Sequence, residues 1–178
     1  MDISILALLI SFYALYKNRL ERADIHIYLG DSLGIVRHNI RSTSTIQLAC
    51  VLANLGAKVG VLNRLVLKIH DDKGNCHNFM WHQFIKHEDV DIVNGLGEVH
   101  PIPVLGKDVC FQRIEFEGEE LRWTAGTYKL ELNGWYNINC SSGPNILVRQ
   151  SFTVDENDQL LLAAPTSHAS AKKFLFNN

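Results

Sequence analysis

The chain has 178 residues, of which 47% are hydrophobic and 20% are charged, and its formal net charge at neutral pH is −2. This composition predicts a folded domain rather than a disordered chain, and the length is sufficient for one ordinary domain with its own core. The nearly neutral charge disfavours an extended nucleic acid as a partner, because neutralising its phosphates requires clustered Lys and Arg.

Residues 1–22 predict a short membrane-anchor helix followed by a basic collar, so membrane lipid is the first expected partner. The fourteen residues 3–16 are apolar except for Ser4 and Ser11. The side chains expected in lipid are Ile3, Ile5, Leu6, Leu8, Leu9, Ile10, Phe12, Tyr13, Leu15 and Tyr16, and those expected at the membrane interface are Lys17, Arg19 and Arg22. Fourteen helical residues measure roughly 21 Å, whereas a bilayer has ~30 Å of hydrocarbon. Such a helix is expected to thin the bilayer, or to bundle with copies of itself in a homo-oligomer.

Two other interpretations of this segment stay open. A cleavable signal peptide has an apolar region of about 7–15 residues, but here no basic residue precedes the apolar run and no small-residue cleavage site follows it. The segment could instead be buried in a protein partner without lipid. For a membrane anchor, the basic residues after the apolar run predict a single-pass topology with the N-terminus outside and the domain in the cytoplasm.

Residues 23–164 show the two-residue hydrophobic alternation of β-strands and predict a mostly β, antiparallel sandwich. Alternation is clearest at residues 25–29, 46–52, 65–69, 110–116, 128–132 and 146–154. Gly30, Asp31 and Gly34 predict a turn after the first strand, and residues 71–75 predict a hairpin turn. Residues 86–107 predict a loop with one or two short edge strands, and residues 165–178 predict a flexible tail.

The last part of this region resembles immunoglobulin-like and fibronectin-like sandwich modules. The matching features are Ala125-Gly126-Thr127-Tyr128-Lys129-Leu130, a loop, and then Ser151-Phe152-Thr153-Val154. The resemblance implies that Tyr128 begins the penultimate strand of an Ig-like sandwich and that Phe152 lies in the last strand. It implies a fold and carries no activity with it.

The polar stretch between the first two predicted strands is the candidate ligand site. Its candidate binding residues are Arg37, His38, Arg41, Ser42 and Thr43. Guanidinium groups bind anions through paired hydrogen bonds and hydroxyl groups add further ones, so the expected ligand is a small anion such as a phosphate or a nucleotide. The alternative interpretation is a solvated loop, or a strand edge protected by its charges.

The sequence contains no recognisable catalytic or cofactor-binding motif, so neither an enzymatic activity nor a cofactor is expected. Cys50, Cys76, Cys110 and Cys140 are far apart and form no C-x-x-C pair, which disfavours a metal site. Free and mostly buried thiols are expected of a cytoplasmic domain, whereas two disulfides are expected in an oxidising space.

These patterns predict a membrane-anchored binding or sensing module with a cytoplasmic β-sandwich, assembled as a homo-oligomer or with a membrane or protein partner. One alternative is a ligand-gated effector, in which an anion captured around Arg37 and Arg41 clusters the short helices and perturbs the bilayer. A second alternative is an extracytoplasmic surface or pilus-like subunit whose cysteines form disulfides.

Overall fold

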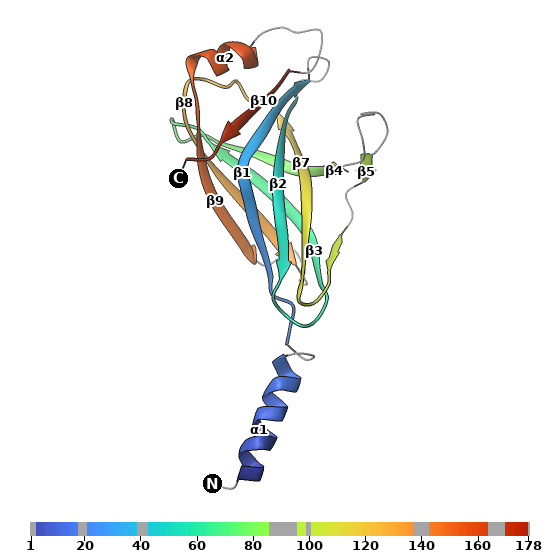
Figure 1. Cartoon of the computed structure of the whole chain (residues 1–178). Coiled ribbons are helices and arrows are strands. Elements are labelled where there is room, and N and C mark those ends of the chain that lie inside the picture. Colours follow the sequence, from blue (N-terminus) through green and yellow to red (C-terminus); the bar gives the residue numbers. More distant parts are fainter. Residues whose placement is uncertain are drawn as a thin grey trace.

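The structure is a computed structural model that describes residues 3–17, 21–38, 43–85, 96–98, 101–136, 143–163 and 170–177. Within these residues the protein is mostly β, with one helix before the strands and a shorter helix near the other end of the chain (Figure 1). The helices are α1 (Ile3–Leu15) and α2 (Glu156–Ala163). The strands are β1 (Ile25–His38), β2 (Thr43–Asn54), β3 (Gly60–His70), β4 (Cys76–Ile85), β5 (Leu96–Glu98), β6 (Ile102–Val104), β7 (Asp108–Glu119), β8 (Gly126–Tyr136), β9 (Ile146–Val154) and β10 (Ser170–Leu175).

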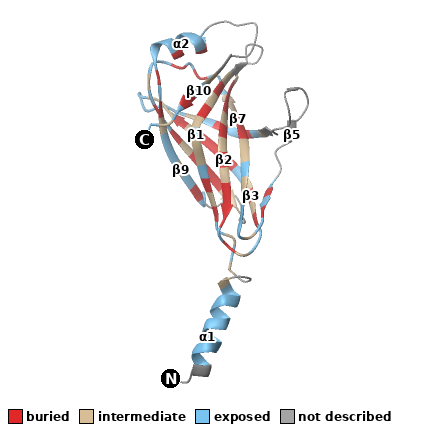
Figure 2. Ribbon diagram, in the orientation of Figure 1, coloured by how far each residue is buried: buried red, intermediate tan, exposed pale blue. Residues whose placement is uncertain are grey.

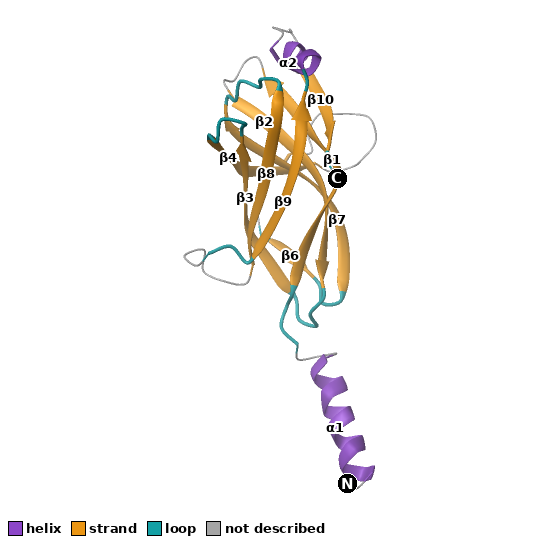
Figure 3. Ribbon diagram, turned by 90° about the vertical axis from the view of Figure 1, so that its left-hand side faces the viewer, coloured by secondary structure: helices purple, strands orange, loops and turns teal. Residues whose placement is uncertain are grey.

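The described strands pair antiparallel in one continuous sheet, in the order β10-β1-β2-β7-β4-β3-β8-β9, with β5 on β4 and β6 on β3. The prediction of a mostly β, antiparallel domain is therefore confirmed. The strands do not divide into two separately hydrogen-bonded sheets, because β4 pairs with both β3 and β7. Instead the sheet wraps around its core until its edges meet, where the Asn177 amide donates to the Ser151 carbonyl at 2.7 Å (Figure 3).

The core fills the inside of the wrapped sheet and consists of the alternate side chains that the hydrophobic pattern predicts. On β8, the side chains of Tyr128, Leu130 and Leu132 are buried, whereas Lys129 and Glu131 between them face outward. Figure 2 shows buried and more accessible positions along the other strands as well, although β2, β3 and β7 each also contain three consecutive buried residues. Because side chains on a strand alternate between its two faces, each apolar position of this kind points into the core.

β10 is a strand that the sequence did not predict. Its Phe174 is buried, and the ring centroid lies 5.7 Å from that of Phe152, which stacks on Tyr128 at 5.5 Å. The prediction of a flexible tail over residues 165–178 is therefore wrong for β10, which pairs with β1. The alternation within so short a strand is too brief to identify it by periodicity, and only the contact with Phe152 in the folded protein reveals it.

β1 passes through the residues where a turn was expected. Residues 30–34 lie within the strand, and its pairing with β2 shifts register between Leu29 and Leu33. Glycine in a strand also favours such a β-bulge, so the glycines indicate a change of register and not the end of the strand. The hairpin turn expected at residues 71–75 is confirmed. β5 and β6 are the short strands expected within residues 86–107.

Candidate functional site

The first candidate site is α1, whose apolar side chains are exposed along its described length. The nine large apolar side chains between Ile5 and Tyr16 are 46–64% exposed. The rest of the helix circumference carries the small residues Ala7, Ser11 and Ala14. Figure 2 shows α1 projecting from one end of the sheet without packing on it. An exposed apolar surface of this extent marks an interaction site, for protein or for membrane.

The predicted membrane and collar residues all belong to α1 or to the segment after it. None of the described helices combines the length and the apolar character that a bilayer crossing requires. Lys17 is half-exposed and Arg22 is exposed, whereas Arg19 lies outside the described residues, as does the side chain of Ile3.

Glu21 connects the end of α1 to two loops of the sheet. Its carboxylate forms an ion pair with Lys17, and a second with Lys107 at 3.1 Å. Its carbonyl accepts hydrogen bonds from the amides of Ala57 and Lys58, at 3.2 and 3.1 Å. The hydrogen bond from Lys17, followed by the one from Lys107, holds the pKa of the Glu21 carboxyl below its usual range. This junction was not predictable from the sequence, because its partners are far apart along the chain.

The predicted anion site lies at the opposite end of β1 from α1. His38 ends β1 and pairs with Thr43, which begins β2. Arg41 and Ser42 lie outside the described residues, as do the side chains of Arg37 and His38. At about 3.3 Å per residue, the length of β1 places the pair of His38 and Thr43 roughly 45 Å from the α1 end of the strand. A ligand bound there would therefore be remote from the helix.

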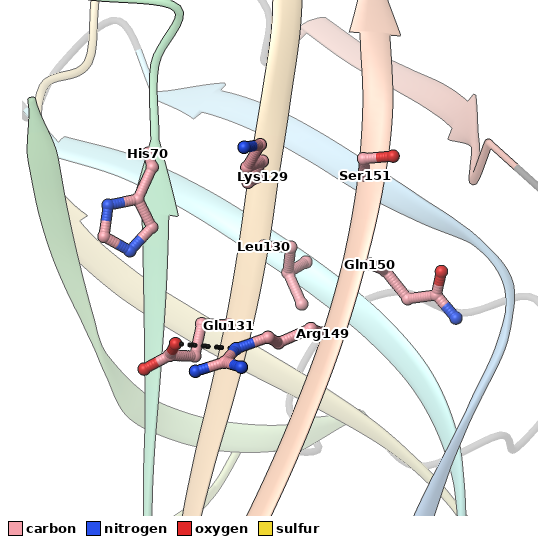
Figure 4. Close-up of a pocket in the computed structure, with 7 residues that line it drawn as sticks. All are labelled: His70, Lys129, Leu130, Glu131, Arg149, Gln150 and Ser151. Atoms are coloured by element: carbon pink, nitrogen blue, oxygen red, sulfur yellow. Dashed lines mark hydrogen bonds and ion pairs between the residues drawn. The ribbon is translucent and has the colours of Figure 1, made fainter. Parts of the chain in front are cut away.

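A hollow of about 530 Å³ on the outer face of β3, β8 and β9 was not predicted. Its lining residues are His70, Lys129, Leu130, Glu131, Arg149, Gln150 and Ser151 (Figure 4). The strand register places His70, Lys129 and Ser151 side by side in one row across the sheet. Glu131 and Arg149 lie in the next row. The alternation of β8 indicates that Lys129 and Glu131 face outward, but it does not show which strands flank them.

Glu131 and Lys129, two side chains of opposite charge in this hollow, differ in their partners. The Glu131 carboxylate accepts hydrogen bonds from Asn133 at 3.1 Å and from Arg149 at 3.2 Å, and Figure 4 shows Arg149 reaching across to it. These bonds, led by the one from Asn133, lower the pKa of Glu131. Lys129 has no carboxylate partner among the described residues. Its ammonium, with the imidazole and hydroxyl groups of its row, can hydrogen-bond a small anion.

The described cysteines carry free thiols and differ in exposure. Cys50 is buried, Cys110 is half-buried and Cys76 is exposed, while Cys140 lies outside the described residues. Burial raises the pKa of the Cys50 thiol to about 12, which makes it unreactive at neutral pH. In the part of the chain that the structure describes, no three His, Cys, Asp or Glu side chains gather where they could hold a metal ion.

Comparison with known proteins identifies no family. No family model and no curated protein matches the chain. Among solved structures, the chain is similar to the "putative ApaA protein" from Bordetella pertussis, with a TM-score of 0.34 and 12% sequence identity, over 72% of this chain and 88% of that one. A likeness at this TM-score supports no inference about function.

Proposed function

We propose that the protein is a membrane-anchored binding module, in which α1 inserts into lipid and the β-domain lies at the membrane surface. The observation that carries this proposal is the exposure of eight large apolar side chains on α1 and of Tyr16 directly after it. Burying one such side chain completely is worth about 1.5–3 kcal/mol, so these half-exposed side chains together favour lipid by an amount on the order of 10 kcal/mol. Because α1 is short for a bilayer, the membrane thins around it or several copies bundle.

The proposal includes a single-pass topology with a cytoplasmic domain. It is supported by Lys17, Arg19 and Arg22, which all follow the apolar run, since basic residues near a membrane segment favour the cytoplasmic side. A homo-oligomer is also part of the proposal. It is supported by Ala7, Ser11 and Ala14 on one face of α1, because small side chains let apolar helices approach each other closely in lipid.

An Ig-like arrangement of the β-domain belongs to the same proposal. The Tyr128 hydroxyl donates to the Thr124 carbonyl at 3.0 Å and accepts from the Thr124 amide at 2.9 Å. Immunoglobulin-like sandwiches carry a comparable tyrosine corner, in which a tyrosine hydroxyl bonds back to the backbone a few residues upstream. This contact supports the resemblance that the sequence around Tyr128 indicates, although the continuous sheet differs from two separate ones.

Membrane fractionation of cells that express the full chain tests the anchor. We expect the wild-type protein to stay in the membrane fraction after an alkaline carbonate wash. The double variant Leu8→Glu with Phe12→Glu should be released, because two charges in the apolar helix oppose insertion. The matched control is Leu160→Glu with Leu161→Glu, which changes two exposed leucines on α2 and should stay in the membrane fraction. Release of the wild-type protein by carbonate contradicts the proposal.

A second candidate function is binding of a small anion, and the row of His70, Lys129 and Ser151 favours it. Titration of the full chain with inorganic phosphate, followed by NMR, tests this function. Weakened binding in Lys129→Ala locates the ligand in the hollow. Weakened binding in the double variant of Arg37→Ala and Arg41→Ala locates it in the hairpin, as the ligand-gated alternative requires. No chemical-shift change at millimolar phosphate rejects a phosphate site at both places.

A further inference from the structure

Two loops next to α1 expose apolar side chains at the same end of the domain. Leu55 and Val59, in the loop between β2 and β3, are 49% and 51% exposed. Leu105, in the loop between β6 and β7, is 58% exposed, and Val109 at the start of β7 is 62% exposed. These four side chains are named the basal rim. Figure 1 shows both loops at the end of the sheet from which α1 projects.

The backbones of the two loops are packed against each other and against the segment that follows α1. A Cβ atom at Gly56 would lie 1.8 Å from the Arg22 carbonyl oxygen, and one at Gly106 would lie 1.9 Å from the Ala57 carbonyl oxygen. The Lys107 amide donates to the Gly56 carbonyl at 2.9 Å. No space remains for a side chain at either glycine, so the two loops are fixed against each other, and the apolar side chains beside them are about half-exposed or more. The basal rim is therefore held in place under the junction with α1.

Charged residues surround the rim, and basic ones predominate slightly. The charged residues described at this end are Lys17, Glu21, Arg22, Asp24, Lys58, Lys107 and Asp108. Glu21, one of the three acidic residues in that set, is paired with both Lys17 and Lys107. Lys58 is exposed next to Val59. Lysine side chains of this kind reach lipid headgroups while apolar neighbours enter the interface.

We propose that the basal rim rests in the interface of the bilayer that receives α1, so that the helix and the end of the domain contact lipid together. This inference depends on the membrane anchoring proposed above and adds a second lipid contact to it. Its basis is continuity, because Glu21 fixes the rim directly beside the helix that enters lipid. A lipid contact of the rim also agrees with the short length of α1. Thirteen residues measure roughly 20 Å, and a domain seated in the interface follows the bilayer surface as the membrane thins around this helix.

A fluorescent probe on the rim tests this contact in the full chain. In the test protein, Cys76, Cys110 and Cys140 are replaced by Ser and the buried Cys50 is kept. The variant Leu105→Cys then provides the thiol to which an environment-sensitive dye is attached. Leu160→Cys on α2 carries the control dye. Both proteins are first floated with phosphatidylcholine vesicles that contain phosphatidylserine, so that anchoring is measured separately. Lipids with a spin label near the headgroup then report contact by quenching.

We expect the dye at position 105 to be quenched at least about threefold more than the dye at position 160, with a blue-shifted emission. Flotation without quenching at position 105 overturns the rim contact and leaves the helix anchor intact. Failure to float overturns both. A blue shift at position 105 that requires no lipid and grows with protein concentration shows a second copy of the chain on the rim, and this also overturns the inference.

A second comparison separates the rim from the helix without a probe. The double variant Leu55→Glu with Leu105→Glu should keep its fold, because both side chains are exposed, and circular dichroism checks this. We expect its partition into the same vesicles to weaken on the order of tenfold relative to Leu160→Glu with Leu161→Glu. Equal partition of the two double variants contradicts a role for the rim.

Discussion

Glu21 accepts a hydrogen bond from the Lys107 ammonium, with 3.1 Å between Oε2 and Nζ, although 86 residues separate them along the chain. The same ammonium donates to the Leu55 carbonyl at 2.6 Å. The segment that leaves α1 and two loops of the sheet thus meet at one charged group. This long-range contact ties the segment that follows α1 to both loops of the sheet.

The first prediction concerns this junction. Glu21→Gln removes the charge that Lys17 and Lys107 share, so the segment after α1 should open more often. We expect trypsin to cleave the vesicle-bound protein after Arg22 roughly threefold faster or more, because proteolysis follows local opening. Glu131→Gln, which removes another ion-paired carboxylate far from α1, is the control and should leave that rate unchanged. Equal cleavage in both variants would mean that the junction is held by its backbone hydrogen bonds alone.

The second prediction concerns pH and the attachment of α2. The Asp158 amide donates to the Asp155 carboxylate at 2.7 Å, and the Asp158 carboxylate contacts Lys172 of β10 at 2.6 Å. The hydrogen bond from Lys172 is the main cause that lowers the pKa of Asp158 below its ordinary value of 3.8. A carboxyl whose pKa is lowered by folding stabilises the protein fully above the unfolded value. This stabilisation is lost as the pH falls through the folded value.

Asp158→Asn should therefore lower the free energy of unfolding at pH 7 by up to about 1 kcal/mol, because it removes the negative charge that pairs with the half-exposed Lys172. The difference from the wild-type protein should shrink below about pH 4 and vanish in stronger acid. Urea unfolding at several pH values measures this, with the exposed Glu156→Gln as control. If the difference in the free energy of unfolding between Asp158→Asn and the wild-type protein stays constant from pH 7 to strong acid, this would contradict an electrostatic role for Asp158.

Much of the β-domain was predictable from the sequence, because burial of one face of a strand imposes an alternation that the sequence must show. Tyr128, Leu130 and Leu132 form such a pattern, and the hairpin turn at residues 71–75 has its own local signal. Gly30 was misread because glycine favours a bulge as well as a turn. Phe174 gave no usable signal, since its burial depends on Phe152, which comes from a distant strand.

The candidate sites were predictable only where function leaves a local pattern. The apolar run of α1 is such a pattern, and the structure shows its side chains exposed. The hollow around Lys129 and the contact between Glu21 and Lys107 arise from strand order, which one sequence does not specify. Arg41 of the expected anion site lies outside the described residues, so that site stays a prediction.

The third prediction separates oligomerisation from anchoring. Ala7→Ile with Ser11→Ile keeps α1 apolar but fills the face where small side chains allow close approach. We expect the variant to remain in membranes while the yield of cross-linked oligomer falls several-fold. Leu8→Ile, on the large-residue face, should behave as the wild-type protein. An unchanged cross-linking pattern would show that α1 does not form the contact between copies.

The fourth prediction concerns topology. Cys76 is exposed and should react with a membrane-impermeant maleimide only after cells are permeabilised, if the domain is cytoplasmic. Cys50, whose pKa burial raises to about 12, should react only after denaturation. Peptide mapping by mass spectrometry identifies which cysteine carries the label. Labelling of Cys76 in intact cells, or disulfides among the cysteines, would favour the extracytoplasmic alternative.

The most direct test of the central claim, that α1 is a lipid anchor, is flotation of the purified full chain with protein-free phosphatidylcholine vesicles. These vesicles contain no protein partner, so they distinguish lipid from a protein that could cover the helix. The account predicts that the wild-type chain rises with the vesicles and that Leu8→Glu with Phe12→Glu stays at the bottom of the gradient. A wild-type chain that stays at the bottom with the variant would contradict the account.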